Sequence, residues 1–182
     1  SFSSAEGSNC VLRNFVITGC DKPDGGAIFL SGASPILINL TITDNRHGIS
    51  AYDGSNPDIV NCILWNNTDG DLSRCRARYS CVENEDPVTW AIGNISTDPM
   101  FADSDNGDYH LMSRYVRYSS INDAWETDSL TSPCVDAGDP GMDPAREQKP
   151  HGGRVNMGAY GGTPFASLSG WPSWAEGNND GN

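Results

Sequence analysis

Four aspartates gather in one short stretch of this chain, at Asp98, Asp103, Asp105 and Asp108. Carboxylate oxygens are the hard ligands that Ca²⁺ prefers, so the stretch predicts a calcium site with these four side chains as ligands. The spacing is not that of an EF-hand, because Gly107 stands at the fifth place of the loop and not at the sixth. The alternative interpretation is a group of turns whose aspartates bond to nearby backbone.

Three arginines, Arg74, Arg76 and Arg78, occupy alternate positions. Alternate residues of a strand point to one face, and guanidinium groups bind carboxylates, so these arginines predict contact with an acidic sugar. Trp65 ends an apolar segment and could stack on a sugar ring. We therefore expect carbohydrate binding by these four side chains. The alternative is a further strand whose solvated face offsets nearby acidic charge.

The segment NTDG at 67–70 resembles an element of polygalacturonases. Those enzymes use two carboxyl groups in opposed roles, and their further paired aspartate, GHG and RIK elements do not occur in this sequence. We therefore assign no catalytic residue and interpret NTDG as a turn. Lyase or hydrolase activity on a polysaccharide is kept as the alternative hypothesis.

The chain contains an even number of cysteines and no CxxC spacing, which argues against a zinc site. An even count in an acidic, glycine-rich chain predicts disulfides and an extracellular or cell-surface location. The alternative is buried free thiols. The sequence leaves the pairing open among Cys10, Cys20, Cys62, Cys75, Cys81 and Cys134.

Charge and composition restrict the partners and the fold. The formal net charge of -13 argues against nucleic acid and against anionic membrane surfaces. The sequence has no apolar run of the ~18 residues that a membrane span needs. The 20 glycines and 11 prolines leave little room for long helices, so the composition favours turns and strands.

One phrase occurs twice in the sequence, as SPILINLTITDN from Ser34 and as NPDIVNCILWNN from Asn56. Glycines recur with a similar period at 26, 48 and 70, and asparagines recur at 14, 39 and 61. The segments within each period are short, rich in β-branched residues and bounded by turn residues. This pattern predicts an all-β fold, a short right-handed parallel β-helix with coils of about 22 residues.

Repeated positions of a solenoid stack on one another, which gives the recurring residues a structural role. We expect Asn14, Asn39 and Asn61 to lie in a bend and to hydrogen-bond the matching asparagine or backbone of the next coil. We expect the glycines of the repeat, including Gly26 and Gly48, to adopt backbone angles that side chains disfavour. An individual coil buries its apolar face against a copy of itself.

The period fades after residue 70, and the second half carries longer motifs. GNISTDPMFADSDNGDYHL, SPCVDAGDP and HGGRVNMGAYGGTPFAS resemble the C-terminal portion of secreted right-handed β-helix repeat proteins of environmental, planctomycete-like bacteria. The resemblance implies the same fold and an extracellular location. We expect solenoid coils in residues 1–90, irregular final coils and a cap in 91–168, and a tail in 169–182 that is similar to the start of a dockerin-like calcium loop.

The sequence opens within a coil and shows no segment that would cover the first coil. An uncovered solenoid end presents unpaired backbone groups, which invite another strand. We therefore expect self-association through the open ends, unless earlier coils of a longer parent cover them. The hypothesis is a non-catalytic structural or adhesive module that assembles head to tail into filaments, and the alternative is a polysaccharide-binding or polysaccharide-degrading β-helix.

Overall fold

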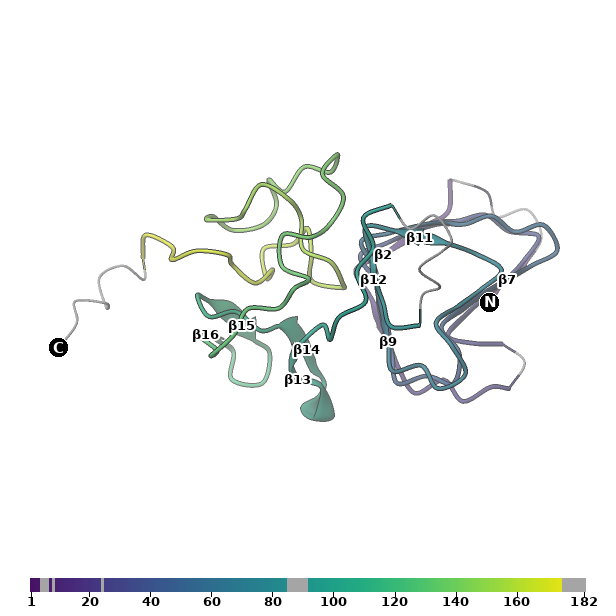
Figure 1. Ribbon diagram of the computed structural model, residues 1–182, viewed down its shortest axis with the longest axis horizontal. Helices are drawn as coiled ribbons and strands as arrows, with labels where there is room; N and C mark the ends of the chain where they lie inside the picture. Colours follow the sequence, from purple (N-terminus) through teal and green to yellow (C-terminus); the bar gives the residue numbers. More distant parts are fainter. Residues whose placement is uncertain (4–6, 8, 24, 85–91, 175–182) are drawn as a thin grey trace.

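The computed structural model describes residues 1–3, 7, 9–23, 25–84 and 92–174 and confirms an all-β solenoid. Its three parallel sheets each contain four strands, one from every pass of the chain (Figure 1). Sheet A consists of β1 (Phe2–Ser3), β4 (Ile28–Ser31), β7 (Ile49–Tyr52) and β10 (Leu72–Ser73). Sheet B consists of β2 (Val11–Arg13), β5 (Ile36–Ile38), β8 (Asp58–Val60) and β11 (Ala77–Arg78). Sheet C consists of β3 (Val16–Ile17), β6 (Thr41–Thr43), β9 (Ile63–Trp65) and β12 (Cys81–Val82).

The core of the solenoid is made of rows of like residues. In sheet A, Ile28 pairs with Ile49, which pairs with Leu72. In sheet C, Ile42 pairs with Leu64. Members of these rows pack in one apolar cluster, where Ile42 and Leu64 have no exposed surface. The repeat therefore sets the register, because a slip by one residue would move every apolar side chain to the other face.

An asparagine pair lies buried within the coil after sheet C. Asn45 donates from both its backbone N and its Nδ2 to Asn67 Oδ1, at 3.2 and 3.0 Å. Asn67 Nδ2 in turn donates to Asp71 Oδ1 at 2.7 Å. Each repeated phrase closes on one of these asparagines, so the signal was present in the sequence. The Gly70 backbone N donates to the Asn67 carbonyl at 3.0 Å, which supports the interpretation of NTDG as a turn.

The glycines of the repeat act in two different ways. Gly26 has a φ of +77°, as expected. Gly48 does not adopt a positive φ, but a Cβ at this position would lie 2.2 Å from the Asp71 carbonyl oxygen. Close approach of two backbones, and not an unusual torsion, requires glycine at position 48.

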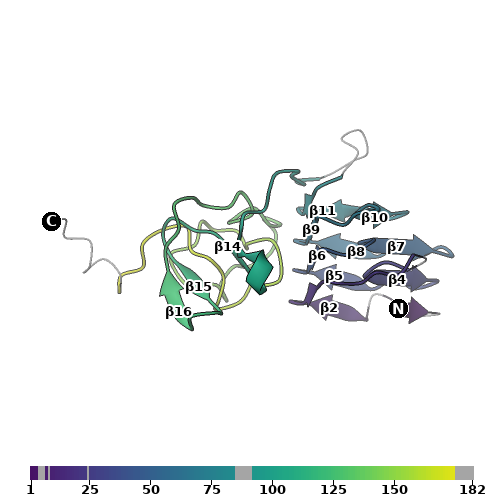
Figure 2. The same ribbon diagram turned by 90° about the horizontal axis from the view of Figure 1, so that it is seen from below.

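The remaining residues form a lobe beside the stack of coils, where the sequence had led us to expect a cap (Figure 2). Its regular elements are β13 (Phe101–Asp103), the 3₁₀ turn η1 (Ser104–Asn106), β14 (Asp108–Leu111), β15 (Arg117–Ser119) and β16 (Ala124–Glu126). Two antiparallel pairs, β13–β14 and β15–β16, are joined by irregular chain. The lobe packs on the outer face of sheet C, where Ile63 and Cys81 cluster with Leu111, Cys134 and Met157.

The row of Asn14, Asn39 and Asn61 attaches the lobe to the solenoid. All three have a positive φ, between 49 and 58°, so the expected bend is confirmed. The expected bonding within the row is wrong. Asn39 Nδ2 donates to the carbonyls of Asn156 and Gly158, and Asn14 Nδ2 donates to two carbonyls of the same segment. A left-handed bend turns these side chains outward, where the lobe supplies acceptors.

The three arginines do not share one strand. The chain forms β10, bends at Arg74, which has a φ of 60°, and resumes as β11 at Ala77. A further strand was predicted here, but a coil must turn from sheet A to sheet B within these residues. Alternation therefore does not place the three side chains on one face.

Among the described residues, no helix has the length and apolar character that crossing a bilayer requires.

Candidate functional site

The outer face of sheet A offers a candidate binding surface. Ile28, Leu30, Ile49 and Ala51 are buried, so the residues that alternate with them point outward. Phe29 pairs with Ser50, which lies beside Ser73, and Ser31 pairs with Tyr52. Aromatic rings and hydroxyl groups are thus brought to one outward face, where the rings are partly exposed and Ser50 is 7% exposed. We call this face the sheet A groove.

Two aromatic rings form the floor of the sheet A groove. The Phe29 and Tyr52 rings stack with centroids 5.4 Å apart and an interplanar angle of 27°. The Arg74 guanidinium lies over the Tyr52 ring, 4.5 Å from its centroid. A cation held against an aromatic face keeps its outer donors free for a ligand. The floor combines an apolar platform with planar hydrogen-bond donors.

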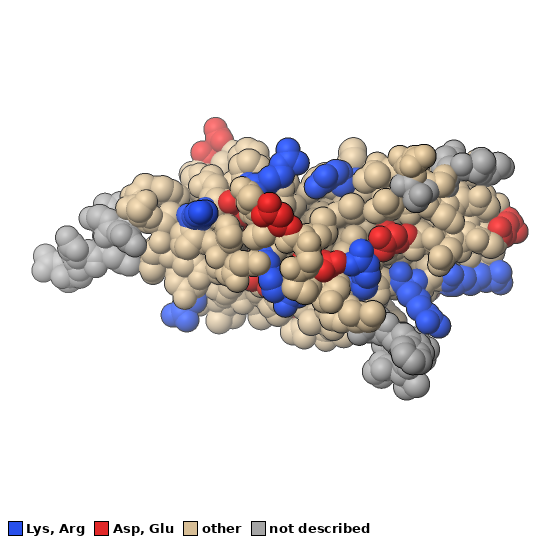
Figure 3. All heavy atoms as spheres, turned by 90° about the horizontal axis from the view of Figure 1, so that it is seen from above, with Lys and Arg blue, Asp and Glu red and all other residues tan. Residues whose placement is uncertain are grey.

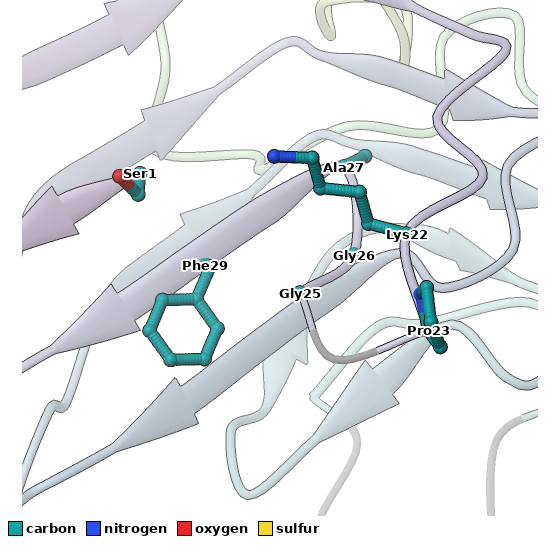
Figure 4. A pocket seen from close by; sticks show the side chains of 7 residues that line it. All are labelled: Ser1, Lys22, Pro23, Gly25, Gly26, Ala27 and Phe29. Atoms are coloured by element: carbon teal, nitrogen blue, oxygen red, sulfur yellow. The ribbon is translucent and has the colours of Figure 1, made fainter.

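Two adjoining hollows give the groove its depth. One, of about 480 Å³, is lined by Phe29, Ser50 and Tyr52 together with His47 and Asp69. The second, of about 440 Å³, extends past Lys22 towards Ser1 and shares Pro23, Gly25 and Phe29 with the first. Figure 4 shows the Lys22 side chain and the Phe29 ring on either side of the Gly25–Gly26 backbone. Together they have room for more than one sugar ring.

The two carboxylates of the groove are already engaged. Asp69 Oδ2 accepts from Arg46 Nε at 2.7 Å and lies 3.6 Å from His47 Nε2. The hydrogen bond from Arg46 lowers the pKa of Asp69, so this carboxylate stays ionised near neutral pH. Asp53 accepts a hydrogen bond from the Ser31 hydroxyl. Neither arrangement prepares a carboxyl group to donate a proton.

The structure separates the four residues predicted to bind carbohydrate. Arg74 lies in the sheet A groove, and Arg76 is exposed in the bend beyond it. Arg78 pairs with Asp58 of sheet B and Asp139 of the lobe, so its charge stabilises the contact between the two parts. Trp65 lines a different hollow, beside Phe101 and Met112 of the lobe.

The four predicted calcium ligands are likewise dispersed. Asp108 is buried and accepts from Arg117 Nη1 at 3.4 Å, while its Oδ1 lies 2.5 Å from His110 Nδ1. Asp98 accepts from the Met100 backbone N, and Asp103 accepts from Asn106. Asp105 lies in η1. No group of three or more His, Cys, Asp or Glu suited to a metal occurs in the part of the chain that the structure describes. The dockerin-like segment lies outside the described residues.

All six cysteines are present as thiols. Cys62 is buried in the solenoid core, and desolvation raises its pKa to about 12. Burial also raises the pKa of Cys75, to about 11. Cys81 and Cys134 meet in the cluster between sheet C and the lobe, whereas Cys10 and Cys20 are partly exposed.

The residues that sequence reasoning missed are Phe29 and Tyr52. Their signal is the alternation in AIFLSG and ISAYDG, where Phe29 falls between buried Ile28 and Leu30 and Tyr52 follows buried Ala51. The two occupy different places in their repeats, so they do not align in the sequence. Their stacking depends on the pairing of β4 with β7 in register.

Charges of both signs occur together on the face of the molecule that Figure 3 shows. Figure 3 shows Lys and Arg interspersed with Asp and Glu over the solenoid and the lobe on one face. Although the formal net charge is -13, cationic side chains are available at the sheet A groove. Lys22 and Arg74 are two of them.

Comparison with known proteins gives one finding. A family model with the description "Disaggregatase related" matches residues 36–138, which is more than half of the chain. The matched range contains β7 and β10 of the sheet A groove and much of the lobe, but not Phe29. Comparisons with curated proteins and with solved structures give no significant match.

Proposed function

Because this chain belongs to the disaggregatase-related family, we propose that it is an extracellular polysaccharide-binding module with an adhesive or structural role. In this proposal a glycan lies along the sheet A groove. The family description refers to a disaggregatase, and a module that holds the polymer of an aggregate is compatible with that word. The observation that carries the proposal is the stacked Phe29–Tyr52 pair under the Arg74 guanidinium.

Binding to a sugar chain would use three features of the groove. The aromatic rings would pack against the apolar faces of sugar rings. The hydroxyls of Ser50 and Ser73 would exchange hydrogen bonds with sugar hydroxyls. Arg74 and Lys22 would favour a polymer that carries carboxylates or sulfates.

The groove favours binding over hydrolysis. Glycoside hydrolysis needs one protonated and one ionised carboxyl group on either side of the bond. Asp69 is held ionised by Arg46, and Asp53 is bonded to Ser31. Asp69 is therefore unsuited to act as the acid, and we assign the module no catalytic role.

Affinity electrophoresis in gels containing polygalacturonate, alginate or neutral xylan tests the proposal, with and without added Ca²⁺. Acidic gels should retard the wild type, and Tyr52→Ala should weaken retention about fivefold, as expected for loss of roughly 1 kcal/mol of ring contact. Trp174→Ala is the matched control, since Trp174 is 56% exposed on the lobe. If the gels retained Tyr52→Ala as strongly as Trp174→Ala, the glycan would bind outside the sheet A groove. Unsaturated products absorbing in the ultraviolet would instead indicate a lyase.

The first coil supports a second candidate, self-association. Among the described residues, β1, β2 and β3 pair on one side only, and Val11 and Phe15 nearby are 49% and 54% exposed. A second copy stacked on this edge would pair the backbone and cover both side chains. Light scattering over a hundredfold concentration range should show growing mass for the wild type and constant mass for Phe15→Glu. A constant monomer mass for the wild type would reject this candidate.

A further inference from the structure

Cys81 and Cys134 meet where the lobe joins the last complete coil of the solenoid. Both side chains are fully buried and belong to one cluster with Ile63, Leu111 and Met157. The Cys81 Sγ donates to the Thr97 carbonyl at 3.2 Å, and a hydrogen bond between the Cys134 and Cys81 side chains raises the pKa of Cys134 together with burial. Two sulfur atoms that are distant in the sequence are therefore neighbours in the fold.

The backbone holds each cysteine in place. Cys81 belongs to β12, and its backbone N donates to the Cys62 carbonyl at 2.9 Å. Cys134 is fixed from both sides, because its N donates to Ser132 Oγ at 3.1 Å and its carbonyl accepts from Met157 N at 3.0 Å. Neither sulfur depends on a loosely held loop for its position.

We propose that Cys81 and Cys134 form a disulfide that joins the solenoid to the lobe. Cys62 and Cys75 belong to the separate cluster of the solenoid core, away from the lobe. Cys62 Sγ donates to the carbonyls of Val60 and Leu37, and Cys75 Sγ donates to the Ile49 carbonyl. Cys81 and Cys134 are distinguished from these two by their location in the cluster that joins sheet C to the lobe.

The bond forms by exchange with a disulfide oxidant such as oxidised glutathione or an oxidoreductase. Each thiol gives up its proton, one S–S bond forms, and two electrons pass to the oxidant, whose disulfide becomes two thiols and takes up the protons. Both protein thiols are buried in the fold. The exchange therefore takes place during folding, before the lobe covers sheet C.

The bond would secure the last coil of the solenoid. The strand β12 has two residues. The next segment of chain pairs with it through a single parallel β-bridge between Cys81 and Ile95. The crosslink also closes a loop that contains both hairpins of the lobe, which restricts the unfolded chain. We expect it to stabilise the terminal coil and the lobe together.

Peptide mapping tests the pairing directly. The protein is made in an oxidising compartment, its free thiols are blocked with iodoacetamide, and it is digested with trypsin without reductant. Residues 79–114 and 118–146 form separate tryptic peptides, each with one cysteine. The proposal expects one species containing both peptides, separated by reductant. Recovery of both peptides with blocked thiols, or linkage of Cys81 to another cysteine, would overturn it.

Thermal unfolding provides the second measurement. Reductant should lower the wild-type melting temperature by roughly 5–15 °C. It should have no such effect on the Cys81→Ala/Cys134→Ala double variant. Cys10→Ala is the control and should keep the wild-type response. If reductant lowered the melting temperature of the double variant as much as that of the wild type, the proposal would be contradicted. If the double variant does not fold, the peptide map of the wild type decides.

Discussion

The side-chain amide of Asn39 donates a hydrogen bond of 2.9 Å to the carbonyl oxygen of Asn156, across 117 residues of chain. The same amide donates to the Gly158 carbonyl at 3.1 Å, and Asn39 is 1% exposed. One residue of the repeat therefore satisfies two backbone acceptors of the lobe. The solenoid and the lobe depend on each other through such contacts.

Replacing Asn39 should loosen this attachment. Asn39→Ala leaves the buried Asn156 carbonyl without a donor, while the Gly158 carbonyl still accepts from the Gly161 backbone N. We expect a loss of about 1–3 kcal/mol in the free energy of unfolding. Denaturant titration measures the loss. Asn66→Ala is the matched control, because Asn66 also has a positive φ, 55°, but hydrogen-bonds to exposed Asp44. Equal losses in the two variants would attribute the effect to the backbone torsion alone.

Gly48→Ala should destabilise the solenoid by about 1–3 kcal/mol. The new Cβ would lie 2.2 Å from the Asp71 carbonyl oxygen, so adjacent coils must move apart. Gly7→Ala is the control, since a Cβ at Gly7 would meet nothing within 4 Å. Urea denaturation of both variants makes the comparison. An unchanged urea midpoint for Gly48→Ala would show that the backbones at Gly48 and Asp71 can move apart with no loss of stability.

Glu147 should make the protein less stable as the pH rises. Desolvation raises its pKa to about 7 from the ordinary 4.5, and its Oε1 accepts from the backbone N of Asn156 and Gly162. The folded state favours the protonated form, so its stabilising contribution is present below pH 4.5 and lost as the pH rises to 7. The loss amounts to about 3 kcal/mol. Glu147→Gln, which stays neutral, should remove this dependence. Parallel stability curves for both proteins between pH 4.5 and 8 would contradict the assignment.

His110 should have the opposite effect in acid. Burial lowers its pKa, although Asp108 partly offsets the shift, and the ring stacks on Tyr160 at 3.5 Å. The folded state favours the neutral imidazole, so stability is lost as the pH falls below the ordinary value of 6.5. His110→Gln should reduce the loss between pH 6.5 and 5, measured by thermal unfolding. His47→Gln is the control, because the His47 side chain is 29% exposed. The slope of stability against pH should therefore differ between His110→Gln and His47→Gln.

Arg74 and Arg76 offer a matched test of the sheet A groove. Arg74→Gln and Arg76→Gln remove the same charge two positions apart, but Arg74 lies over Tyr52 whereas Arg76 is exposed in the bend. Retention by polygalacturonate should fall about three- to tenfold for Arg74→Gln and change little for Arg76→Gln. Equal losses of retention for Arg74→Gln and Arg76→Gln would indicate nonspecific attraction between charges. Added salt would then abolish the effect of both substitutions.

The arginines and asparagines show where sequence reasoning stops. Alternate spacing indicated one strand for Arg74, Arg76 and Arg78, but the chain had to bend within them. The asparagine repeat indicated a bend, which the positive φ values confirm. It could not indicate the bonding partner, since the acceptors of Asn39 lie in a segment with no repeat. Position within a coil is a local property, whereas the neighbour outside the coil depends on how the whole chain folds back.

The sequence by itself determined the solenoid, because each coil must bury its apolar row against a like row, and such rows recur visibly at Ile28, Ile49 and Leu72. Tertiary structure alone decided that the lobe covers sheet C and that Cys81 meets Cys134. It also decided that sheet A keeps an open aromatic face. These relationships join residues with no common period, and they arise from packing between surfaces that exist only after the coils have formed.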